Sequence, residues 1–78
     1  MTGVTMFLET AEEELAAGND ARAIETLREL FESTTDADVI DEIRTFAVTA
    51  HESSTGFHRI EWERLAIDAE SRGMVMLR

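Results

Sequence analysis

The side chains best suited to chemistry lie close together in the sequence, between His51 and Glu61. His51 and His58 are the two histidines of the chain, and imidazole is the side chain whose ordinary pKa lies nearest neutrality. Ser53 and Ser54 follow His51, so a serine–histidine pair for nucleophilic catalysis has to be considered. No glycine-rich turn that could bind an oxyanion accompanies them. We therefore interpret both serines as helix-ending residues and expect no enzymatic activity.

A metal site is the second chemical possibility. His58 and Glu61 are three residues apart, which places both on one face of a helix. A di-iron bundle requires two Glu-x-x-His motifs, but neither histidine follows a glutamate at that spacing. Residues 36–38, Asp-Ala-Asp, lack the glycine and the final glutamate of a calcium-binding loop. We expect neither a metal ion nor another cofactor.

The composition indicates one small folded domain, residues 1–78. The chain has 44% hydrophobic residues, enough to fold, but a domain of this size buries only about 60% of the surface of its unfolded chain. It has no cysteine, so neither disulfides nor thiolate zinc sites can stabilise it. The core must come from helix packing alone, or from helix packing together with a partner chain.

The net charge is −10, and all of this excess lies in residues 1–58. Such a charge disfavours binding to nucleic acid or to an anionic membrane, and it permits a basic protein partner. The first basic residue is Arg22, so the start of the sequence lacks the charged region of a signal peptide. The longest run of bulky apolar residues, Met74–Leu77, is far too short for a membrane span. We expect a cytoplasmic protein.

The spacing of apolar residues predicts four helices, over about residues 4–17, 20–32, 36–52 and 57–72. The second has the clearest amphipathic pattern, with Gly18 expected at positive φ before it and Asp20 as its N-cap. Thr35 and Asp38 resemble a capping box for the third helix. Short links between the helices predict an all-α domain built from two antiparallel hairpins. Phe46 is expected at the centre of the core. Trp62, the single tryptophan, is interpreted as a core residue on the main apolar face of the last helix.

The first hairpin, about residues 4–35, resembles a tetratricopeptide (TPR) repeat. When Gly18 is placed at the turn glycine of that family, four further positions match in residue type: Phe7, Ala11, Ala23 and Leu27. Four positions depart from the pattern: Thr10, Glu14, Asp20 and Thr35. The last two helices do not repeat the register. The resemblance implies a protein-binding scaffold and no catalytic activity.

The fourth predicted helix differs from the others because it has two apolar faces. One face is formed by Trp62, Leu65, Ala66 and Ala69, and the other by Phe57, Ile60 and Ile67. A helix with two apolar faces must bury both or expose one. Gly73 is expected to end this helix, so that Met74 packs back on Ala69 and an apolar tail follows.

These patterns favour a non-enzymatic protein–protein interaction module. We expect it to self-associate as a dimer, or to bind a protein partner, through the last helix and the tail: Phe57, Ile60, Ile67, Met74, Met76 and Leu77. The competing possibility for this face is that the chain's own tail covers it. The alternative function is an acidic inhibitor or antitoxin-like regulator that binds a basic groove through the acidic side chains of the first three helices: Glu12, Glu13, Asp38 and Asp41.

Overall fold

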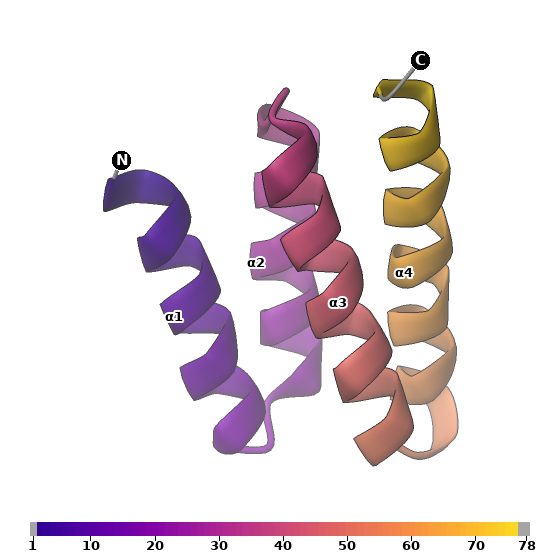
Figure 1. Cartoon of the computed structure of the whole chain (residues 1–78). Coiled ribbons are helices and arrows are strands. Elements are labelled where there is room, and N and C mark those ends of the chain that lie inside the picture. The colour runs from indigo at the N-terminus through magenta and orange to yellow at the C-terminus, as the bar shows by residue number, and fades with distance from the viewer. Residues whose placement is uncertain (1, 77–78) are drawn as a thin grey trace.

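Four helices make up the fold in the computed structural model of the chain, which describes residues 2–76 and the side chains of residues 4–74 (Figure 1). They are α1 (Thr2–Ala16), α2 (Asp20–Ser33), α3 (Ala37–Ser53) and α4 (Gly56–Met76). The described part of the chain contains no strand. The predicted all-α class and the two antiparallel hairpins, α1–α2 and α3–α4, are confirmed.

The helices α1 and α4 lie at opposite edges of the domain, and between them α2 lies behind α3 in the view of Figure 1. The α3–α4 pair has the most extensive contact, and α2 also packs against α4. An edge helix can use one face for the core, because its other side meets no helix of its own chain. The position of α4 at an edge is therefore what leaves one of its two apolar faces open.

The centre of the core comes from three helices, α2, α3 and α4. Its largest fully buried side chains are Trp62, Leu27, Ile40, Ile43 and Leu65. Each side chain of this kind contributes about 1.5–3 kcal/mol through removal of its apolar surface from water. The prediction for Trp62 is thus confirmed.

The prediction that Phe46 occupies the centre of the core is wrong. Phe46 is half-buried at the side of α3 that faces α1, and its ring centroid lies 5.7 Å from that of Trp62. The physical reason is the position of α1, which packs mainly against α2 and leaves this side of α3 partly uncovered. Small residues bring α1 and α2 together, since Ala11 and Ala23 are fully buried.

The ends of the helices agree with the sequence in part. Gly18 has φ of +81°, as predicted for the turn between α1 and α2. Asp20 does not cap α2, because the helix follows Asn19 and the Asp20 carboxylate binds groups of other elements. The N-cap of α3 is Asp36, whose Oδ1 accepts a hydrogen bond from Asp38 N at 2.9 Å, so the predicted cap at Thr35 is also wrong.

The fourth helix is longer than the sequence predicts. It continues through Gly73, which does not have a positive φ, and extends to Met76. The predicted ending at Gly73, with Met74 folded back, is therefore wrong. Gly73 lies against α3, where a Cβ added to it would be 3.6 Å from Ile40 Cγ2. Packing along α3 thus outweighs the low helical propensity of a single glycine.

Candidate protein interface

Two polar contacts at one oxygen fix the N-terminal half of α4. Trp62 Nε1 donates a hydrogen bond of 3.1 Å to Asp20 Oδ2, and Ser54 Oγ donates one of 2.8 Å to the same oxygen. The indole N–H of a buried tryptophan needs such a partner. Asp20 therefore joins the start of α2 to the α3–α4 turn and to the core face of α4.

These contacts lower the pKa of the Asp20 carboxyl group. The hydrogen bond from Trp62 is the largest cause, while partial burial acts in the opposite direction and raises the pKa. The hydrogen bond from Ser54 and the charge of His58 lower it further. The ionised carboxylate is thus the form that the fold stabilises.

Arginine residues fix the rest of α4 to α2. Arg28 Nη1 lies 3.4 Å from Asp68 Oδ2 near the middle of the two helices. Further along, Arg72 donates hydrogen bonds to the carbonyl oxygens of Phe31 and Thr34, the latter at 2.9 Å. Its guanidinium group also lies 5.0 Å from the centroid of the Phe31 ring. Arg72 therefore satisfies carbonyl groups at the end of α2.

The opposite face of α4 is open to solvent. Four of the six residues predicted for the interface are exposed large hydrophobic side chains: Phe57 (73%), Ile60 (64%), Ile67 (56%) and Met74 (64%). The other two, the side chain of Met76 and all of Leu77, lie outside the described residues. Within the described part of the chain, no segment covers this face.

The exposed face has a regular spacing. Its residues follow one another at intervals of three, four, three, four and three: Phe57, Ile60, Arg64, Ile67, Ser71 and Met74. This is the spacing of positions a and d in a heptad repeat, in which a helix presents one seam to another helix. Ile60, Ile67 and Met74 occupy d, whereas Phe57, Arg64 and Ser71 occupy a. We call these six residues the outer seam of α4.

Carboxylates line both sides of the outer seam. Glu63 and Glu70 are exposed, and they stand one residue before the a positions. They lie on the side toward α3, since Glu63 is 3.6 Å from His51 and Glu70 lines a cleft together with Ala37 and Asp41. Asp68 lies on the side toward α2, where Arg28 contacts it, and Glu61 precedes it by seven residues; both stand one residue after a d position. Asp68 is already paired with Arg28. The face therefore combines an apolar centre with negative edges.

The serine and histidine side chains make separate contacts in the described part of the chain. Asp20, Ser54 and His58 line one cleft of about 280 Å³. Ser54 donates to Asp20, whereas His58 Nδ1 lies 3.3 Å from Glu61 Oε1. Ser53 donates to carbonyl oxygens of its own helix. Ser54 meets His51 through its backbone N–H, which donates a hydrogen bond of 3.4 Å to the His51 carbonyl oxygen. The hydrogen bonds of the two serine hydroxyl groups thus go to Asp20 and to backbone carbonyl oxygens.

The histidines make polar contacts with charged side chains at the surface. His51 Nε2 lies 3.6 Å from Glu63 Oε2 and accepts a hydrogen bond from Arg59 Nε at 3.3 Å. Among the described residues, His, Asp and Glu side chains nowhere come together in groups of three that could hold a metal ion. The contacts of His51 with Arg59 and Glu63 join α3 to α4.

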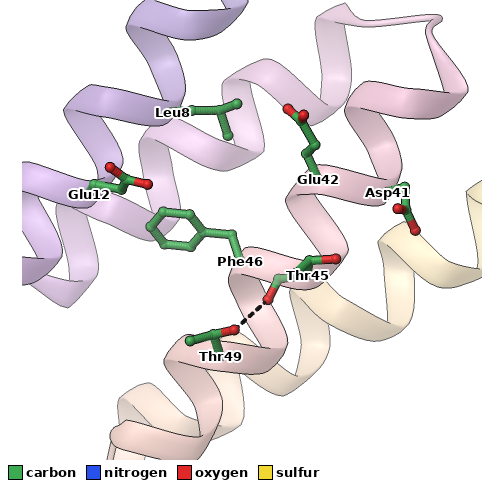
Figure 2. A pocket seen from close by; sticks show the side chains of 7 residues that line it. All are labelled: Leu8, Glu12, Asp41, Glu42, Thr45, Phe46 and Thr49. Carbon is green, nitrogen blue, oxygen red and sulfur yellow. Dashed lines mark hydrogen bonds between the residues drawn. The ribbon is translucent and has the colours of Figure 1, made fainter.

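The acidic residues of α1 and α3 border a separate groove of about 530 Å³ (Figure 2). Leu8 and Phe46 supply its apolar surface, and Phe46 extends from α3 toward α1. Glu12, Asp41 and Glu42 supply its carboxylates. Two other residues predicted for the acidic surface do not line this groove: Glu13 and Asp38.

Comparisons with known protein families, curated proteins and solved structures find no match to this chain. Within residues 2–76, every helix is too short or too polar to cross a membrane. The class of the protein is therefore defined by its fold and its surface, as a small all-α domain with an exposed apolar seam on an edge helix.

Sequence reasoning located the exposed apolar residues but missed the seam. The two polar residues in it, Arg64 and Ser71, look like interruptions of an apolar face. They become part of a pattern only when α4 is one unbroken helix through Gly73, because the heptad spacing then runs to Met74. The bridge from Asp20 to Trp62 joins residues far apart in the sequence and has no local signal.

Proposed function

We propose that this chain is a non-enzymatic protein–protein interaction module whose contact surface is the outer seam of α4. The observation that carries the proposal is the exposure of four large apolar side chains along one side of a helix whose other side is buried and hydrogen-bonded to α2: Phe57, Ile60, Ile67 and Met74. Apolar side chains aligned on a folded helix favour association, because the backbone that carries them needs no further ordering on binding. The partner in such a contact is either a second copy of the chain or another protein.

Sedimentation equilibrium and affinity capture test this proposal together. Ile67→Glu places a charge in the middle of the seam and should abolish any self-association or partner capture of the wild-type protein. Val48→Glu is the matched control, because Val48 is an exposed aliphatic residue on α3, outside the seam. A wild-type protein whose mass and captured partners are unchanged by Ile67→Glu would contradict the proposal.

The TPR-like character of the α1–α2 hairpin stays a prediction. The complete burial of Ala11 and Ala23, the small residues at the crossing of the two helices, supports it. The positive φ of Gly18 at the turn supports it as well. A TPR-like hairpin would serve the proposed function as a scaffold that holds α4.

A second candidate function is an acidic regulator that binds a basic partner through α1–α3. The groove in Figure 2 favours it, since Glu12 and Glu42 lie on the same side of α3 as the apolar side chains of Leu8 and Phe46. A cationic side chain with an aliphatic stem fits such a site. Glu12→Gln combined with Glu42→Gln should then weaken partner binding and its salt dependence. Unchanged binding in this double variant would exclude the groove.

A further inference from the structure

We propose that the occupant of the outer seam is an amphipathic helix of another protein, with apolar residues at heptad spacing and Lys or Arg on both flanks. This inference rests on the proposed function and names the chemistry of its partner. It follows from the apolar residues of the seam and from the carboxylates beside it. Each possible occupant can be judged by the side chains that it would place against them.

A second copy in parallel orientation is a poor occupant. Parallel pairing places each a residue opposite itself, so Arg64 would meet Arg64 of the second copy at the centre of the contact. It would also place Glu63 beside Asp68 of the second copy, because the positions before a and after d meet across a parallel pair. Both encounters bring like charges together in a partly desolvated contact.

An antiparallel second copy fits no better. In the register that overlaps the whole seam, a positions face d positions, so Arg64 lies opposite Ile67 and Ser71 opposite Ile60. Four of the six layers then pair an apolar with a polar side chain. The same register places Glu63 beside Glu70 of the other copy. Two chains of net charge −10 each would also repel at longer range.

A basic amphipathic helix removes these conflicts. Apolar side chains at its own a and d positions pack on Phe57, Ile60, Ile67 and Met74. Lysine or arginine on its flanks meets the exposed carboxylates Glu63 and Glu70 on one side and those near α2 on the other. Opposite charges at these flanking positions determine partner choice and orientation in helix pairs. The length of α4, 21 residues, provides three heptads for such pairing.

Designed peptides test the inference on the full chain. One fluorescent probe is as long as α4, with Leu at a and d and Lys on the flanks; a second has Glu on the flanks; a third has the composition of the first in scrambled order. We expect the Lys-flanked probe to bind at least about tenfold more tightly than either of the others. Ile67→Glu should weaken that binding by at least about tenfold, whereas Val48→Glu should leave it within about twofold.

The charge contribution has its own variants. Glu63→Gln combined with Glu70→Gln should weaken binding of the Lys-flanked probe about threefold to tenfold and reduce its dependence on salt. Circular dichroism and the fluorescence of buried Trp62 confirm that each variant is folded. Equal affinity for the Lys-flanked and Glu-flanked probes would overturn the inference, and so would equal affinity for the scrambled probe.

Sedimentation equilibrium separates this inference from the function on which it rests. A monomeric wild-type protein supports the inference. A dimer that Ile67→Glu converts to a monomer would overturn it in favour of a second copy, while the interaction function stands. If Ile67→Glu alters neither probe binding nor mass, both the inference and the proposed function fail.

Discussion

The inner and outer faces of α4 contain side chains of the same apolar kind in different surroundings. Trp62, Leu65 and Ala69 on the inner face are fully buried against α2 and α3. Ile60 and Ile67 on the outer face have more than half of their surface exposed. The two faces share one helix, so the difference lies in what the neighbouring helices cover.

The inner face is also fixed by specific polar contacts, which the outer face lacks within the described residues. Trp62 binds Asp20 at one end, and Arg72 binds the last turn of α2 at the other. Hydrophobic burial is non-directional, whereas hydrogen bonds require one orientation. The two contacts therefore determine which face of α4 points inward. The exposed face is a defined product of the fold.

The largest expected effect tests the difference between the faces directly. Leu65→Ala should lower the free energy of unfolding by about 2–5 kcal/mol, because it leaves a cavity in the core. Ile67→Ala on the outer face should change it by no more than about 0.5 kcal/mol. Urea denaturation of both variants measures the contrast. Equal losses at the two positions would mean that Ile67 is packed in solution, which would contradict an uncovered outer face of α4.

The next largest effect is expected for the hydrogen bond between Asp20 of α2 and Trp62 of α4. Asp20→Ala leaves the N–H group of buried Trp62 and the hydroxyl of Ser54 without their acceptor, and should cost about 1–3 kcal/mol of stability. Urea denaturation followed by Trp62 fluorescence measures this loss. Glu9→Gln, at an exposed position of α1, is the control and should have little effect. A stability equal to that of the wild type would show that the bridge does not orient α4.

The pH dependence of stability tests whether the ionised Asp20 carboxylate stabilises the fold. Folding lowers the pKa of Asp20, so the stability that its carboxylate contributes is fully present above the unfolded pKa of about 4 and is lost as the pH falls through the folded pKa. Asp20→Asn removes this contribution. The wild type should therefore be more stable than Asp20→Asn at neutral pH, and the difference should shrink in acid. Denaturation curves of both proteins across this range provide the measurement, and a constant difference would contradict it.

A matched pair of arginines gives a smaller effect. Arg72→Met removes the hydrogen bonds to the end of α2 and the contact with the Phe31 ring, and should cost about 1–2 kcal/mol. Arg64→Met changes the outer seam instead and should leave stability within about 0.5 kcal/mol. Thermal denaturation of the two variants measures the loss of stability at each face of α4. A similar loss from both would show that Arg64 has a structural role.

The smallest expected effect tests whether α4, and with it both of its faces, continues beyond Gly73. Gly73 lies inside α4 without a positive φ, and an added Cβ would make an ordinary contact with Ile40. Gly73→Ala should therefore stabilise the protein by about 0.5–1 kcal/mol. Gly56→Ala is the control, since φ of +65° there should make it destabilising. Destabilisation by Gly73→Ala would mean that the helix ends at this glycine and that the seam is shorter.

The sequence alone determined the number of helices, their hairpin order and their apolar faces. Periodicity and the short links at Gly18 and before Gly56 carry that information, because both are local properties of the chain. The exposed residues Phe57, Ile60 and Ile67 were also identified from the pattern. Local signals were less reliable at helix ends, since Asp20 and Gly73 have residue types that normally cap helices but serve tertiary contacts here.

Only the tertiary structure decided which apolar face of α4 is buried and how far the other extends. Either face is apolar enough to join a core, and the choice depends on Asp20, Phe31 and Thr34, which lie far from α4 in the sequence. The packing of Gly73 on Ile40 then keeps the helix intact to Met76. Contacts between distant residues have no periodic signature, so the surface on which the proposed function depends emerges only when the helices are assembled.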